Sequence, residues 1–148
     1  MLILLAVLAA VVLAVVVTVR YGLVVVNVLG VSMQPTFADG DRALAVRRRW
    51  WRRTARGDVV VCLPPPLPGV QPTGPDRPTH GPPVVKRIVG VAGDEMTVGD
   101  RVTAVPAGHV WLRGDGRHTY DSDQYGALPE TAVTAVVVGR LPARRARR

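Results

Sequence analysis

The sequence predicts a mainly β fold: a single small β domain preceded by one apolar N-terminal helix. After residue 20 the apolar residues come in short valine-rich runs that glycine and proline separate, and no helical period is visible. Before that point, the first nineteen residues form an uninterrupted apolar run, polar only at Thr18. A chain of 148 residues has room for one domain besides this run.

The N-terminal run is long enough to cross a membrane, because a helix rises 1.5 Å per residue and the hydrocarbon core is roughly 30 Å thick. A cleavable signal peptide is the alternative, but the run lacks a basic first region and is long for the apolar part of such a peptide. We therefore expect a permanent transmembrane anchor at 1–20, the β domain at 21–141, and a basic tail at 142–148.

Eight short runs in the domain have the composition of strands. They cover residues 23–29, 43–46, 59–63, 84–91, 96–98, 101–103, 110–112 and 133–138. Gly99 and Asp100 separate two of these runs, which predicts a tight hairpin. The stretch 63–83 holds nine prolines, so we expect it to be a loop without regular structure.

A serine stands at the centre of a turn between the first two predicted strands. Ser32 lies in the stretch GVSMQPT, and the chain has only one other serine, Ser122. Pro35 restricts the backbone, and Gly40 with Asp41 supplies a second turn, so the segment suits the presentation of a hydroxyl. Turn chemistry alone fits a plain loop equally well.

Lys86 decides between these interpretations, because it is the only lysine among nineteen basic residues. Arginine stays charged in proteins, whereas a desolvated lysine can lose its proton near neutral pH. Branched apolar residues surround Lys86 in the sequence, which predicts burial and a lowered pKa. A neutral lysine beside Ser32 would form a Ser-Lys dyad with the amine as general base. The alternative is an edge-strand lysine with its ammonium in water.

Other reactive side chains have weaker patterns. Cys62 is the only cysteine, which excludes an intrachain disulfide, and its valine-rich surroundings predict a small buried hydrophobe. The three histidines share no metal-ligand spacing, so we expect no metal and no cofactor. Of the three histidines, only His118 lies within a stretch with other candidate residues, at 114–126.

Arginines flank two tryptophans in the stretch 47–53. Arginine and tryptophan suit nucleic acid, through phosphate contacts and base stacking, and they equally suit anionic lipid at a membrane surface. A solvated hairpin tip without a partner is the third interpretation. Because the stretch follows the anchor closely, we expect the lipid bilayer as its partner and no nucleic acid.

Four stretches together resemble the motifs of type I signal peptidases. GVSMQPTFADGD at 30–41 resembles the nucleophile motif, S-M-x-P-T with Gly-Asp shortly after, and RGDVVV at 56–61 resembles the strand motif that follows. KRIVGVAGDEM at 86–96 is similar to the lysine motif K-R-x-x-G-x-x-G-D, and GDGRHTYDSDQYG at 114–126 is similar to the last motif. The four stretches come in the family's order.

The resemblance implies a membrane-anchored serine endopeptidase that cleaves signal or leader peptides from exported preproteins. In that mechanism Lys86 deprotonates the hydroxyl of Ser32, whose backbone N–H helps to bind the oxyanion. Gly30 stands where family members often carry a second donor, a side-chain hydroxyl. The resemblance also implies substrates with small side chains before the cut, held extended against a strand.

The last motif departs from the family pattern. Gly116 replaces the usual Asn and one residue is deleted. With Asp121 and Ser122 aligned to the family's Asp-Ser, Thr119 takes the place of the serine that orients the lysine. Asp123 replaces the usual Arg, and Arg117 is a candidate for the missing cation.

The resemblance implies a single-pass protein of the cytoplasmic (plasma) membrane with its domain on the outer face. The positive-inside rule opposes this placement, because Arg20 stands at the end of the anchor and the arginines at 47–53 follow it, although long domains cross largely regardless of charge. Two other functions stay open: a dedicated maturation protease for one cargo, and a non-catalytic membrane-surface binding protein with the same fold. The sequence does not predict the oligomeric state.

Overall fold

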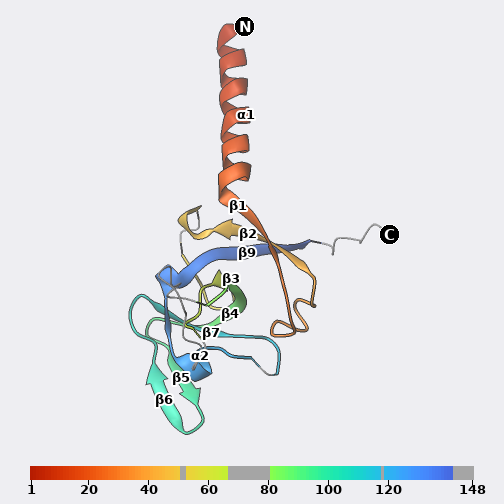
Figure 1. The fold of residues 1–148 in the computed structure, drawn as a ribbon. Coiled ribbons are helices and arrows are strands. Elements are labelled where there is room, and N and C mark those ends of the chain that lie inside the picture. The colour runs from red at the N-terminus through yellow and green to blue at the C-terminus, as the bar shows by residue number, and fades with distance from the viewer. Residues whose placement is uncertain (51–52, 67–80, 118, 142–148) are drawn as a thin grey trace, which may run out of the picture.

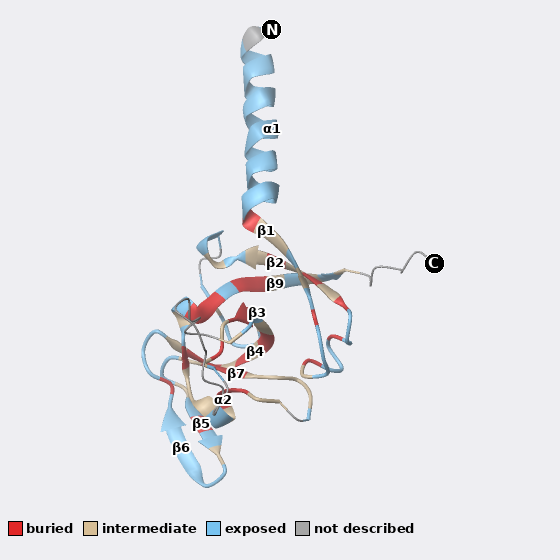
Figure 2. Cartoon of the chain, viewed as in Figure 1, coloured by how far each residue is buried: buried red, intermediate tan, exposed pale blue. Residues whose placement is uncertain are grey.

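The computed structural model describes residues 1–50, 53–66, 81–117 and 119–141. Helix α1 (Leu2–Gly22) extends away from the rest of the chain, and its side chains from Ile3 to Tyr21 are exposed (Figures 1 and 2). Of the described helices, it alone is long and apolar enough to cross a membrane, over Ile3–Gly22. The predicted anchor thus corresponds to one continuous helix that runs two residues further.

The domain is built on one antiparallel sheet in the order β1-β2-β9-β3-β4-β7-β8. Its strands are β1 (Leu23–Asn27), β2 (Arg42–Arg47), β3 (Val59–Cys62), β4 (Val84–Val91), β7 (His109–Arg113), β8 (Leu128–Pro129) and β9 (Val133–Leu141). β5 (Glu95–Val98) and β6 (Arg101–Ala104) form a separate hairpin, as the Gly99-Asp100 turn predicted. The mainly β fold with one N-terminal helix is confirmed.

Apolar side chains pack on both faces of the sheet. Because successive strand residues point to opposite faces, β4 contributes Ile88 to one cluster and Val85 to the other. The first cluster includes Val60, Cys62 and Leu112, all 0% exposed. Each fully buried Val, Leu or Ile side chain stabilises the fold by about 1.5–3 kcal/mol. The core therefore buries much of β3 and β4 in the middle of the sheet (Figure 2).

The helical turns after residue 22 were not predicted. Helix α2 (Ser122–Tyr125) is one turn long, and η1 (Arg48–Trp50) and η2 (Glu130–Ala132) are single 3₁₀ turns. One turn is too short to show a 3.6-residue period. α2 begins with a capping box, in which the carboxylate of Asp121 accepts a backbone N–H and the Gln124 side chain accepts the Asp121 N–H.

The eight predicted strands agree with the structure to within a few residues. The first one is shorter than predicted, because it ends at Asn27 instead of continuing to residue 29. There the chain turns, and Val28 N–H donates to the Asp41 carbonyl over 2.8 Å. Residues 67–80 of the predicted loop, His80, His118 and the predicted tail at 142–148 lie outside the described residues.

Candidate active site

Ser32 lies in the loop that joins β1 to β2. Hydrogen bonds between Val28 and Asp41 and between Gly40 and Val28 close the base of this loop. Met33, next to Ser32, is 0% exposed and packs in the same cluster as Val85 of β4. Ser32 itself is half-buried. The buried methionine therefore anchors the loop while the serine remains accessible.

Gly30 adopts a conformation that suits glycine, with φ at +87°. Its N–H donates to Oδ1 of Asp39 over 2.7 Å. No atom of the loop surroundings lies within 4 Å of where a Cβ would stand, so the backbone angle, and not a lack of space, disfavours other residues. Gly30 offers no hydroxyl, and its N–H already has an acceptor.

Lys86 is buried in β4, at 4% exposed. It pairs across the sheet with Val60, and it shares its face of β4 with Val84 and Ile88. The predicted burial is confirmed, but Val85 points to the opposite face, because neighbouring strand residues alternate. Desolvation lowers the pKa of Lys86, against the opposing effects of the Asp121 carboxylate and, to a smaller extent, Cys62.

The segment 114–116 packs directly against the backbone of Ser32. Gly116 N–H donates to the Ser32 carbonyl over 2.9 Å. A Cβ at Gly116 would stand 2.5 Å from the Val31 carbonyl oxygen, and one at Gly114 would stand 2.5 Å from that of Ser32. Neither position has room for a side chain in this arrangement, which explains the glycine at 116 where an asparagine was expected.

Asp121 joins this segment to the lysine. Its Oδ2 accepts hydrogen bonds from the hydroxyl of Thr119 and from Gly114 N–H, the latter over 3.2 Å, and its charge raises the pKa of Lys86. The hydroxyl of Thr119 is therefore directed at Asp121. Ser122 is 0% exposed, and its Oγ accepts the Leu112 N–H over 2.9 Å. This contact attaches α2 to β7.

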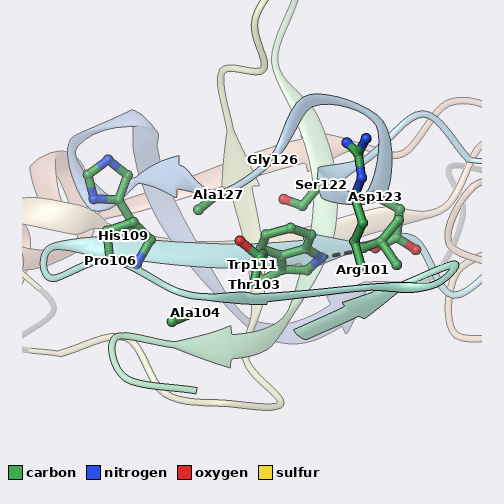
Figure 3. Close-up of a pocket in the computed structure, with 11 residues that line it drawn as sticks. Arg101, Thr103, Ala104, Pro106, His109, Trp111, Ser122, Asp123, Gly126 and Ala127 are labelled. Atoms are coloured by element: carbon green, nitrogen blue, oxygen red, sulfur yellow. Dashed lines mark hydrogen bonds between the residues drawn. The ribbon is translucent and has the colours of Figure 1, made fainter. Parts of the chain in front are cut away.

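Asp123 has a cation partner other than the expected Arg117. Arg113 Nε donates to both carboxylate oxygens of Asp123 over 2.9 Å. Trp111 Nε1 donates to Oδ1 over the same distance, 2.9 Å (Figure 3). Arg117 is exposed. The described lining of the 430 Å³ cavity in Figure 3, between the β5–β6 hairpin and α2, includes neither Ser32 nor Lys86.

Arg87 connects all four motifs, a role that the sequence reasoning missed. Its Nε and Nη2 donate to Asp115 over 2.8 and 2.7 Å, its Nη2 to the Thr36 hydroxyl over 3.2 Å, and its Nη1 to the Gly57 carbonyl over 2.8 Å. Thr36 Oγ1 also donates to Asp115 over 2.6 Å. The sequence did contain a pointer to this role, because each of the three side chains occupies a fixed position of a motif. Thr36 is the T of S-M-x-P-T, Arg87 is the R of K-R, and Asp115 is the D of G-D.

The Arg87 contacts have electrostatic consequences. The hydrogen bond from Arg87 is the largest influence on Asp115 and lowers the pKa of that carboxyl. The same bond raises the pKa of Arg87. Since neighbouring strand residues face opposite sides, β4 can direct Lys86 inward and Arg87 toward the Ser32 loop.

Space for an extended ligand adjoins the loop. A cavity of about 520 Å³ is lined by Val31, Gln34, Pro35, Asp115, Gly116 and Arg117. β4 pairs with β3 over residues 84–87 but with β7 only from Arg87 onward. The second edge of residues 84–86 therefore has no strand partner in the described chain.

Some expected contacts are absent from the described residues. No hydrogen bond of Ser32 Oγ or Lys86 Nζ is present in this part of the chain. Catalytic hydrogen bonds often tighten only when substrate binds. Within the same residues, no group of three or more His, Cys, Asp and Glu side chains could hold a metal ion.

Residues 1–104 match the family model described as signal peptidase, peptidase S26. This chain belongs to the S26 signal peptidase family. This S26 peptidase is 34% identical over 120 residues to mitochondrial inner membrane protease subunit 1 of Schizosaccharomyces pombe, an alignment that covers 76% of this chain and 69% of the relative. It is 35% identical over 114 residues to subunit 2 of the Danio rerio protease, with 70% and 56% covered.

A third relative of this S26 peptidase, mitochondrial inner membrane protease subunit 1 of Xenopus tropicalis, is 32% identical over 120 residues. The alignment covers 76% of this chain and 62% of that relative. The chain thus spans between 56% and 69% of the length of these three proteins. The match supports a peptidase with one candidate membrane span.

Proposed function

We propose that this S26 peptidase is a membrane-anchored serine endopeptidase that cleaves signal or leader peptides from exported preproteins with a Ser32–Lys86 dyad. One observation carries the proposal: the only lysine of the chain is 4% exposed, and desolvation lowers its pKa. The adjacent Arg87 is tied through Asp115 and Thr36 to the loop that bears Ser32. Burial supplies the neutral amine, and these contacts hold the two elements together.

In the proposed mechanism, neutral Lys86 accepts the proton of the Ser32 hydroxyl while Oγ attacks the scissile carbonyl carbon. The proton then passes from Lys86 to the leaving amine nitrogen as the peptide C–N bond breaks, which leaves an acyl-enzyme. Lys86 next deprotonates a water molecule, which hydrolyses the ester and restores Ser32.

The Ser32 backbone N–H is the proposed first donor to the oxyanion. The N–H of Gly30 is an unsuitable second donor, because it is engaged by Asp39 over 2.7 Å. Thr119 and Asp121 are proposed to position Lys86. The Thr119 hydroxyl would act indirectly, by holding the Asp121 carboxylate whose charge reaches the lysine.

The substrate is proposed to bind as an extended chain along the unpaired edge of residues 84–86 of β4. This edge leads to Lys86, so a peptide paired there would present a carbonyl near the dyad. The residues that follow the cut could then occupy the cavity beside Ser32, where Arg117 and Asp115 supply charges of both signs.

The membrane placement is also part of the proposal. We propose that α1 anchors the protein in the cytoplasmic membrane with the domain on the outer face. The similarity to mitochondrial inner membrane protease subunits supports an anchored protease. Protease protection of sealed vesicles tests this placement: an accessible domain in right-side-out vesicles and a shielded one in inverted vesicles are expected.

The function is tested with full-length protein in detergent micelles and a preprotein with small residues before the cut. We expect Ser32→Ala and Lys86→Arg each to abolish cleavage while the thermal unfolding transition stays cooperative. Lys86→Arg is the sharper variant, because arginine keeps the charge but cannot act as a base. Ser122→Ala is the matched control: it removes the other serine, whose Oγ accepts the Leu112 N–H, and folded protein should still cleave.

Cleavage by Lys86→Arg would refute the dyad. Wild-type protein that binds the preprotein without cleaving it would instead favour a non-catalytic membrane-surface protein. Activity confined to one cargo among several preproteins would favour a dedicated maturation protease.

A further inference from the structure

A cavity of about 580 Å³ lies where the membrane helix meets the domain, away from the candidate active site. Its lining includes Tyr21 and Thr131 and four arginines: Arg20, Arg47, Arg48 and Arg49. These residues come from three parts of the chain, namely the last turn of α1, the end of β2 with η1, and the η2 turn before β9.

Strand register explains why the arginines gather at this point. β1 follows α1 directly, and its first residue, Leu23, pairs with Val46 of β2. Arg47 therefore lies level with the end of the helix, and it pairs on its other side with Ala135 of β9. Figure 1 shows β1 and β2 directly beneath α1, with β9 next to them. The cavity is thus fixed at the point where α1 ends.

The charge at this cavity is strongly positive. Among the described residues, no ion pair joins Arg20, Arg47 or Arg49 to an acidic side chain. Arg48 is held by Glu130 over 2.8 Å. Among the described side chains, four arginines and one glutamate leave three net positive charges. The end of a helix contributes about half a negative charge, which is too little to reverse this sign.

Aromatic rings accompany the arginines. The Arg20 guanidinium lies 6.0 Å from the ring centroid of Tyr21, and that of Arg49 lies 5.8 Å from the ring of Trp50. Trp50 is 44% exposed, and its ring lies beside Gly22 at the end of α1. Tyrosine and tryptophan favour the headgroup level of a bilayer, and arginine matches phosphate oxygens with paired hydrogen bonds.

We propose that this cavity binds the phosphodiester headgroup of an anionic phospholipid. A lipid fits better than a free phosphate or a nucleic acid, because the cavity adjoins the end of a 20-residue apolar span with exposed side chains. The acyl chains of a bound lipid would lie along this helix while its phosphate meets Arg20, Arg47 and Arg49. The bound lipid would fix the height of the domain above the membrane.

The test uses full-length protein in dodecyl maltoside, titrated with phosphatidylglycerol or phosphatidylcholine and followed by native mass spectrometry. We expect phosphatidylglycerol to bind at least about tenfold more tightly, since each arginine near an anionic lipid contributes a factor of roughly five. The double variant Arg47→Gln/Arg49→Gln should lose about 25-fold in phosphatidylglycerol affinity.

Arg56→Gln/Arg101→Gln is the matched control, because it removes the same charge from exposed positions outside the cavity lining. The control should bind within about twofold of wild type, and a thermal melt shows that both double variants are folded. Ser32→Ala should bind lipid normally, so the lipid site can stand even if the proposed catalysis fails.

Equal affinity for phosphatidylglycerol and phosphatidylcholine would refute the proposed lipid site. So would a loss of phosphatidylglycerol affinity in the control variant as large as that in Arg47→Gln/Arg49→Gln. Two soluble probes separate the sources of phosphate. Glycerol 3-phosphate that bound as tightly as phosphatidylglycerol would point to a free phosphate site. A single-stranded oligonucleotide that displaced bound phosphatidylglycerol, at an oligonucleotide concentration below the lipid concentration, would point to a nucleic-acid site.

Discussion

The guanidinium group of Arg87 and the carboxylate of Asp115 form a two-point ion pair, with nitrogen–oxygen distances of 2.8 and 2.7 Å. The pair is largely shielded, with 29% of the arginine side chain and 17% of the aspartate side chain exposed. Thr36 joins it from the Ser32 loop. The lysine strand, the serine loop and the segment after β7 are therefore held by one charged group.

Asp115→Asn should weaken both folding and cleavage. The change removes the ion pair and leaves the partly buried guanidinium poorly compensated, so we expect a loss of about 1–3 kcal/mol in the free energy of unfolding. Urea unfolding measures it, and kcat/KM should fall because the Ser32 loop loses an anchor. Arg56→Gln is the control, since the arginine of its ion pair with Asp94 is 61% exposed and the pair should matter less. An equal loss in both variants would contradict this role.

The stability contributed by Asp115 should also depend on pH. Its pKa is lowered in the folded protein, so the contribution is present above the unfolded value of about 3.9 and is lost as pH falls through the folded value. The difference in unfolding free energy between wild type and Asp115→Asn should therefore shrink below about pH 4. A difference that persisted unchanged at pH 2 would contradict the electrostatic explanation.

The pH–rate profile should report the lowered pKa of Lys86. Cleavage requires the neutral amine in the proposed mechanism, so kcat/KM should rise with pH to a plateau, with its midpoint below the ordinary lysine value of 10.5. Because the folded pKa is depressed for a cation, stability should fall as pH drops below the unfolded value and level off below the folded one. A midpoint near 10.5 would mean an ordinary solvated lysine.

Asp121→Asn should move that midpoint to lower pH. The Asp121 carboxylate raises the pKa of Lys86, whereas desolvation lowers it. Without the negative charge at position 121, the pKa of Lys86 should therefore fall further. Asparagine keeps an oxygen that can cap α2, which limits the effect on folding. Asp123→Asn is the matched control, because that carboxylate is paired with Arg113. An unchanged midpoint in Asp121→Asn would show that the carboxylate does not act on the lysine.

Cys62→Ala should retain cleavage. The thiol is 0% exposed, and burial raises its pKa to about 12, so it is neither accessible nor a thiolate at neutral pH. Folded native protein should likewise resist iodoacetamide, as mass spectrometry can show. Loss of cleavage in a folded Cys62→Ala variant, or rapid alkylation with inactivation, would indicate a thiol mechanism.

Local patterns in the sequence were enough to predict every described strand except the two-residue β8, and also the long apolar helix and the two central candidates. Ser32 and Lys86 are conspicuous because the chain has so few serines and lysines, and the burial of Lys86 follows from the branched residues of its own strand. The β5–β6 hairpin was equally predictable from the sequence, since the two turn residues Gly99 and Asp100 specify it.

The tertiary structure alone decided the partners of the charged residues. Arg87 meets Thr36, Gly57 and Asp115 across 51, 30 and 28 residues of sequence, and nothing in the local pattern distinguishes it from seventeen other arginines. Asp123 is paired with Arg113 on a neighbouring strand instead of with the nearby Arg117. Hydrophobic alternation determines which side of a strand a residue faces, but which charge it meets there depends on how distant strands are placed in register.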